Sequence, residues 1–117
     1  MASFHEARKH LSKKTRDMHR ALLSLQEELQ AIDWYCQRVD ACHDAQLRDI
    51  QLHNMREEME HSALLIEWLR RKDSDFDRPL NSHLFSDAPT TGRKKTFTAP
   101  VFANDSRSPT IGNLKLS

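Results

Sequence analysis

Residues 47–71 are LRDIQLHNMREEMEHSALLIEWLRR, a stretch without glycine or proline. At about 100° per residue, one apolar stripe runs along the helix that this stretch predicts, made of Leu47, Ile50, Leu65 and Trp68. Glu58 and His61 fall in the middle of that stripe, three residues apart and therefore on neighbouring turns of one face. A carboxylate is costly to bury unless it is paired or bound to a cation. The stretch therefore predicts a helix that offers two ligands to one metal ion.

The rest of the chain places this helix in a hairpin. A helix is expected over about residues 45–72, and a longer one over about 6–40, which also lacks glycine and proline. Residues 40–44 form the expected turn, and Asp44 is a candidate N-cap. Helices joined by so short a turn pack antiparallel. A short third helix is expected around Asp75–Phe85.

The first helix supplies a further ligand. Its apolar stripe has heptad-like spacing and consists of Met18, Leu22, Leu25, Leu29, Ile32 and Cys36. Glu28 flanks this stripe, so the hairpin presents one Glu from the first helix and a Glu-x-x-His from the second. Di-iron carboxylate bundles use that set twice, from four helices. The predicted fold class is all-α: a hairpin that dimerises into a four-helix bundle and so completes the metal site.

The ligand types favour a hard-to-borderline divalent metal, because the set contains carboxylates and an imidazole but no thiolate. Iron fits, although zinc or manganese could occupy the same ligands. Glu-x-x-His is also common on solvated helix faces, so the motif alone is weak. A second apolar strip could be a further oligomer interface or scattered surface residues, and it comprises Leu23, Trp34, Leu52, Met55, Met59 and Ile66.

Composition divides the 117 residues into an acidic part and a basic part. Residues 1–84 carry 13 Lys and Arg against 15 Asp and Glu, whereas residues 85–117 carry 5 against 2. The second part is rich in Pro, Thr and Ser without periodicity, so we expect disorder in isolation. The expected organisation is a helical half-bundle over 1–85, a flexible linker over 86–107 and a binding peptide over 108–117.

Several classes of protein are disfavoured. Residues 1–10 lack the apolar run of a secretory signal, and no stretch reaches the about 18 apolar residues that span a membrane. Cys36 and Cys42 suggest no disulfide framework and suit a reducing cytosol. The basic run Arg93-Lys94-Lys95 is weak support for nucleic-acid binding. We expect a cytosolic protein with no membrane or nucleic-acid partner.

The two helices resemble the encapsulated ferritins over roughly residues 17–86. The resemblance is carried by LQEELQAIDWY at 25–35, QRVDAC at 37–42, HNMREEMEH at 53–61 and LLIEWLRR at 64–71. It implies a dimeric four-helix bundle with a ferroxidase site at the dimer interface, and a ring-shaped decamer of five dimers. It also implies that Glu28, Glu58 and His61 bind iron and that Tyr35 lies beside the site.

The same resemblance implies accessory metal sites that take calcium or zinc. It assigns them residues on both helices: Glu27, Gln30, Trp34, His53, Glu57 and Glu60. Gln30 departs from the family pattern, which has an acidic residue there, and this puts an accessory site for incoming iron in doubt. The catalytic ligands are unaffected.

Residues 108–117, SPTIGNLKLS, resemble the targeting peptides of encapsulin cargo. The matching positions are Thr110, Ile111, Gly112, Asn113, Leu114 and Lys115. The expected function is oxidation of Fe(II) to Fe(III) with O2, delivering iron for mineral storage inside an encapsulin nanocompartment of the bacterial or archaeal cytoplasm. The alternative is a non-catalytic helical scaffold or adaptor, docked to a partner by this tail.

Overall fold

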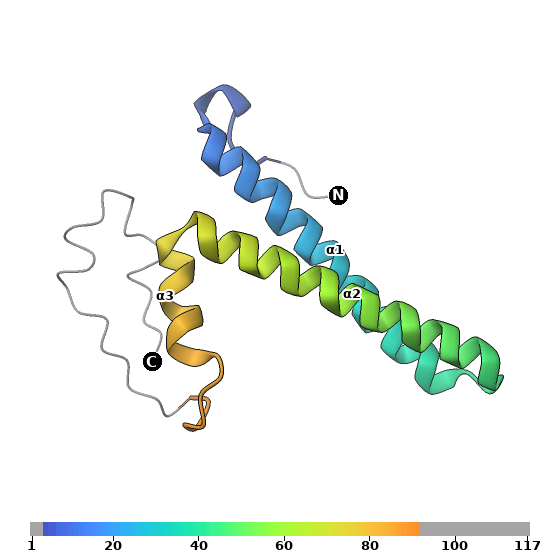
Figure 1. Cartoon of the computed structure of the whole chain (residues 1–117). Coiled ribbons are helices and arrows are strands. Elements are labelled where there is room, and N and C mark those ends of the chain that lie inside the picture. Colours follow the sequence, from blue (N-terminus) through green and yellow to red (C-terminus); the bar gives the residue numbers. More distant parts are fainter. Residues whose placement is uncertain (1–3, 92–117) are drawn as a thin grey trace. The chain divides into compact units, whose positions relative to one another are not determined.

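The protein is described over residues 4–91 by a computed structural model, in which the regular elements are all helices, joined and flanked by turns and short irregular segments (Figure 1). The elements are a 3-10 turn, Arg8–His10, and the helices α1 (Lys13–Ala41), α2 (Ala45–Lys72) and α3 (Ser74–His83). The predicted all-α fold is confirmed for the described residues. The chain forms two compact units that divide between Trp68 and Leu69. The predicted targeting peptide and the basic run at 93–95 lie outside the described residues.

The first helix starts later than predicted. We expected helix from about residue 6, but residues 8–10 form a 3-10 turn and α1 begins at Lys13. The reason is Ser12, an extended N-cap residue whose hydroxyl accepts a hydrogen bond from the Thr15 amide at 3.1 Å. The preceding segment folds back along α1, where the Phe4 and His19 rings lie 4.5 Å apart between centroids.

The turn and the second helix follow the prediction. The Asp44 carboxylate accepts a hydrogen bond from the Leu47 amide at 2.9 Å and so caps the helix start. α2 covers the predicted range, Ala45–Lys72. It runs antiparallel to α1, and the two helices lie side by side (Figure 1). The hairpin therefore brings the middle of α1 opposite the middle of α2.

The second unit contains the last turn of α2 and α3. Two ion pairs fix it: Arg70 contacts Asp77 at 2.6 Å, and Arg78 contacts Asp75 at 2.8 Å. The predicted short third helix is confirmed, but it ends at His83 rather than near Phe85, whose φ of 55° lies outside the right-handed helical region.

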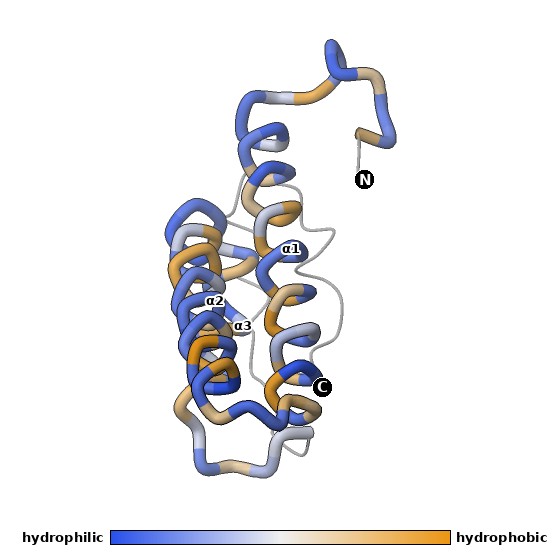
Figure 2. The backbone as a smooth tube through the Cα atoms, turned by 90° about the vertical axis from the view of Figure 1, so that its right-hand side faces the viewer, coloured by the Kyte–Doolittle hydropathy of each residue, from blue (hydrophilic) through white to orange (hydrophobic). Residues whose placement is uncertain are grey.

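The hairpin has a thin core. Of the described residues of α1 and α2, only Ala21, Ser62 and Leu69 are buried, and Leu69 belongs to the second unit. Much of the predicted apolar stripes stays open to solvent: Leu29, Leu47 and Ile50 are each about half exposed. Figure 2 shows apolar and polar residues interleaved along both helices of the hairpin. Among residues 4–91, no helix has the continuous apolar length that a membrane span requires.

The Asp44 cap should be a measurable part of the stability of the hairpin. Asp44→Ala should lower the free energy of unfolding by about 1 kcal/mol, because one amide at the start of α2 loses its acceptor. Asp44→Ser, which keeps a capping oxygen, should stay close to wild type. Urea unfolding followed by circular dichroism measures both. Equal destabilisation by Ala and Ser would contradict the capping role.

Candidate metal centre

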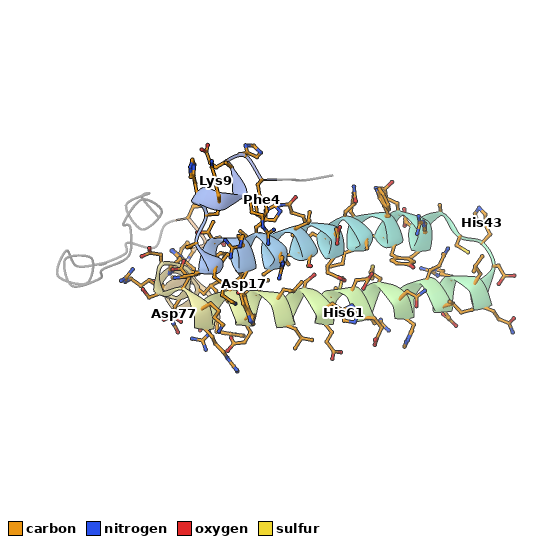
Figure 3. All side chains as sticks on the ribbon, turned by 90° about the horizontal axis from the view of Figure 1, so that it is seen from above. Phe4, Lys9, Asp17, His43, His61 and Asp77 are labelled. Atoms are coloured by element: carbon orange, nitrogen blue, oxygen red, sulfur yellow. The ribbon has the colours of Figure 1, made fainter. Side chains whose placement is uncertain are left out.

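The three predicted ligands converge between the middles of α1 and α2. Nδ1 of His61 lies 2.8 Å from Oε1 of Glu58 and 3.3 Å from Oε1 of Glu28. One ligand atom from each residue falls within 4.8 Å of the other two. In the part of the chain that the structure describes, these are the only three His, Cys, Asp or Glu side chains that meet in this way. Figure 3 labels His61 on α2.

The site opens towards solvent on the His61 side. The Glu28 and Glu58 side chains are about three-quarters covered, whereas the His61 side chain is 48% exposed. The donor set of two carboxylates and one imidazole suits a divalent ion such as iron, manganese or zinc. Three ligands leave coordination positions open on an iron ion, for solvent, a substrate or further protein ligands.

Electrostatics at the site show why a cation would stabilise it. The neighbouring Glu58 raises the pKa of Glu28 above its ordinary value, first because a protonated Glu28 can share a hydrogen bond with the Glu58 carboxylate. Partial burial and the repulsion between the two carboxylates act in the same direction, and His61 opposes them. Without a metal, Glu28 therefore keeps its proton to a higher pH than an isolated carboxyl group does, and a divalent ion would compete with that proton.

The pKa of His61 is also shifted by its two carboxylate neighbours. Its hydrogen bond to Glu58 raises the pKa of the imidazole above its ordinary value, and Glu28 adds to this effect. A protonated His61 can donate its Nδ1–H to these carboxylates but cannot bind a metal through that nitrogen. Protons and metal ions therefore compete for the same three side chains, and metal binding should weaken as the pH falls.

Tyr35 lies on α1, seven residues from Glu28 towards the hairpin turn, which corresponds to about 10 Å along the helix. It is half-buried. The Arg38 guanidinium lies 5.2 Å from the centroid of the Tyr35 ring and 6.0 Å from that of Trp34. These cation–π contacts hold both aromatic rings beside one cation. Arg38 was not among the predicted site residues, although its spacing of three and four residues from the two rings is a recognisable signal.

The predicted accessory residues are not assembled into a site within one chain. All six are exposed on the hairpin: Glu27, Gln30, Trp34, His53, Glu57 and Glu60. His53, Glu57 and Glu60 follow one another along α2, but among the described residues their ligand atoms do not form a group of three. Any metal bound by these residues would need further ligands.

Ser62 is a second residue at the site that the sequence analysis missed. It is only 5% exposed, and its hydroxyl donates a hydrogen bond to the main-chain carbonyl oxygen of Glu58 at 3.0 Å. The signal in the sequence was a small polar residue directly after His61, ahead of the apolar run at 63–66.

These features define an all-helical hairpin with a carboxylate–histidine cluster that is a candidate metal site, and comparison with known proteins gives its family. A sequence profile described as EncFtn-like matches residues 3–87. A Rhodospirillum rubrum protein named "Encapsulated ferritin-like protein" is 45% identical over 97 residues, covering 83% of this chain and 69% of that protein. The chain belongs to the EncFtn-like family, which confirms the resemblance to the encapsulated ferritins.

Two further proteins are similar to this chain, one in sequence and one in structure. A "Ferritin-like protein" from Thermotoga maritima is 49% identical over 88 residues, covering 75% of this chain and 77% of its own length. A crystal structure of a protein from Nitrosomonas europaea superposes with a TM-score of 0.72 at 51% identity, covering 75% of this chain and 97% of that one. The solved structure therefore shares the helical fold of this chain.

The hydrogen bond between His61 and Glu58 predicts a raised pKa for the His61 imidazole, which can be measured. His61 in the metal-free protein should titrate above its ordinary value of 6.5, because the protonated ring donates to Glu58. This contribution to folding stability is present at low pH and is lost as the pH rises through the raised pKa. Glu58→Gln should lower the pKa of His61 more than Glu28→Gln does, since Glu58 is the stronger partner. NMR titration of the imidazole measures all three proteins, and an unchanged pKa in Glu58→Gln would contradict the assignment.

Proposed function

We propose that the protein is a ferroxidase that oxidises Fe(II) to Fe(III) with O2 as the electron acceptor. The observation that supports this most strongly is the convergence of two carboxylates and an imidazole within 4.8 Å on one hairpin. Iron is the substrate, and oxygen- and nitrogen-donor ligands without a thiolate suit both of its oxidation states. Membership of the EncFtn-like family agrees with an iron-related role.

The site requires a second copy of the chain. One hairpin supplies half of the ligand set that di-iron bundles take from four helices. The half-exposed apolar residues Leu29, Leu47 and Ile50 belong to the stripes that also contain or flank the ligands. Two-fold pairing through these stripes would bury them, form a four-helix bundle and bring two Glu28–Glu58–His61 sets together at the interface. Five such dimers would form the ring-shaped decamer that the family resemblance implies.

The side chains of this chain would then have distinct roles. Glu28, Glu58 and His61 bind and orient the iron, and Glu58 is the candidate bridge between two ions. His61 must lose its Nδ1 proton on loading if that nitrogen is the ligand. Tyr35, held beside Arg38, is positioned near the centre rather than at it. The exposed acidic and histidine side chains, Glu27, His53, Glu57 and Glu60, would attract cations towards the interface, with calcium or zinc as further occupants.

The oxidised iron would be stored by a partner. An open ring of helices encloses no mineral, so storage requires a surrounding shell. We propose that residues 108–117 bind an encapsulin shell protein, with Ile111 and Leu114 as apolar anchors and Gly112 allowing close approach of the backbone. The name of the Rhodospirillum rubrum relative agrees with this placement. The protein would work inside a nanocompartment in the cytoplasm of a bacterium or archaeon.

Removal of the ligands tests the activity. The double variant Glu58→Ala/His61→Ala should lose O2-dependent Fe(II) oxidation, measured by absorbance of Fe(III) and by oxygen consumption, because the iron loses two of three ligands. Asp40→Ala/His43→Ala is the matched control, since it removes an exposed acid and histidine with the same spacing. Wild-type rates in the ligand variant would instead support a non-catalytic scaffold.

A charge on the apolar stripe tests the need for a dimer. Ile50→Asp should shift the protein towards monomers in sedimentation velocity, and the oxidation rate per chain should fall with the fraction of dimer. Gln37→Glu adds the same charge at an exposed position off the stripe and should leave both unchanged. A monomeric Ile50→Asp protein with full activity would contradict a shared site.

Deletion of residues 108–117 tests the partner. The full chain should copurify with a coexpressed encapsulin shell protein, whereas the shortened chain should not. Its iron oxidation in solution should stay at the wild-type rate, because the deleted residues lie far along the chain from the ligands. Copurification of the shortened chain at wild-type yield would contradict the role of this peptide.

A further inference from the structure

Ser62 follows His61 and differs from its neighbours on α2 in being buried. Its exposure is 5%, whereas Ala63 and Leu64 are exposed, so the Ser62 side chain points into the hairpin. Its hydroxyl donates to the Glu58 carbonyl oxygen at 3.0 Å. In an α-helix that carbonyl already accepts the amide of the residue four positions later, which is also Ser62. Both donors of Ser62 therefore converge on the backbone of Glu58.

The helical turn closed by this bond contains both metal ligands of α2. It runs from Glu58 to Ser62 and includes His61. A serine hydroxyl that bonds to the carbonyl four residues earlier bends a helix slightly, because the carbonyl must serve a second donor. A small change in this turn changes the directions of the Glu58 and His61 side chains relative to each other and to Glu28. The geometry of the centre and the Ser62 bond are thus linked through one turn of backbone.

Helix stability alone does not require serine at this position. Alanine is smaller, fits the same space and is a better helix former than serine. The hydroxyl also requires a partner once it is buried, and alanine would remove that requirement. The cost of serine is therefore offset only if the hydroxyl has an effect that alanine cannot supply.

We propose that Ser62 is a positioning residue for the metal centre, whose hydrogen bond to the Glu58 carbonyl sets the turn that aims Glu58 and His61 at one ion. This inference rests on the proposed metal-binding function and adds a residue that contacts no ion itself. Groups that orient metal ligands typically change affinity by about 10- to 100-fold when they are removed. Because the Ser62 effect passes through the main chain, we expect the lower end of that range.

Four variants of the full chain separate the hydrogen bond from packing. Ser62→Ala removes the hydroxyl. Ser62→Thr and Ser62→Val add the same bulk, and only Thr keeps the hydroxyl. Ser82→Ala is the control, a half-buried serine replaced in α3. The probe is Co(II) alone, added without oxygen chemistry, with affinity from titration and ligand geometry from the visible absorption bands of the bound ion. Thermal unfolding of each metal-free protein is measured in parallel.

The expected result is a loss of metal affinity without a loss of fold. Ser62→Ala should bind Co(II) about 10-fold more weakly and with shifted absorption bands, while its metal-free unfolding temperature stays at or above that of wild type. Ser62→Thr should keep the wild-type bands, and Ser62→Val should lose them. Ser82→Ala should match wild type in every measurement.

Three results would overturn the inference, and they can be told apart. Wild-type affinity and absorption bands in Ser62→Ala, with Co(II) binding still lost in Glu58→Ala/His61→Ala, would leave the metal centre standing and remove the role of Ser62. Equal effects of Ser62→Thr and Ser62→Val would likewise assign the residue to packing only. A wild-type protein that binds no Co(II) would overturn the metal centre and this inference together.

Discussion

The meeting of Glu28 and Glu58 across the hairpin is the interaction on which the rest of the structure depends. Two carboxylates brought together between packed helices repel each other unless a proton, a histidine or a cation lies between them. His61 fills that role in the metal-free chain, with Nδ1 2.8 Å from Glu58 and 3.3 Å from Glu28. A divalent ion between the two carboxylates would carry more positive charge than a protonated His61 and would displace the proton. Holding these two carboxylates together therefore costs folding free energy unless a cation lies between them.

The rest of the hairpin buries few residues and leaves apolar side chains exposed. Of the described residues of α1 and α2, only Ala21, Ser62 and Leu69 are buried, and Leu69 belongs to the second unit, while apolar residues of both stripes stay half exposed. A pair of helices with so little buried surface gains little stability alone. A second copy would cover the stripes and supply the missing ligands in one step, so that assembly and metal binding stabilise the same interface. The proposed dimer would therefore bury the exposed apolar stripes and would also complete the set of metal ligands.

The sequence predicted the parts of the structure that local chemistry determines. The bounds of α2, the Asp44 cap and the meeting of Glu28 with Glu58 and His61 follow from helical spacing and a short turn. The start of α1 at Lys13, after the Ser12 cap, and the end of α3 before Phe85 were missed, because no proline or glycine marks either point. Helical periodicity also could not identify Ser62 as an inward-facing residue. An apolar stripe shows that a face is to be buried, but not whether the same chain or another one buries it.

A crystal structure of the protein soaked with Fe(II) under anaerobic conditions tests the central claim most directly, with anomalous scattering at the iron edge locating the ions. Two ions should lie between two copies of the chain, spaced by about 3.5–4 Å as in two-metal sites. Glu28, Glu58 and His61 of both copies should surround them. Iron bound within a single hairpin, or bound only at the exposed acidic residues with the Glu28–Glu58–His61 cluster free of metal, would contradict the account.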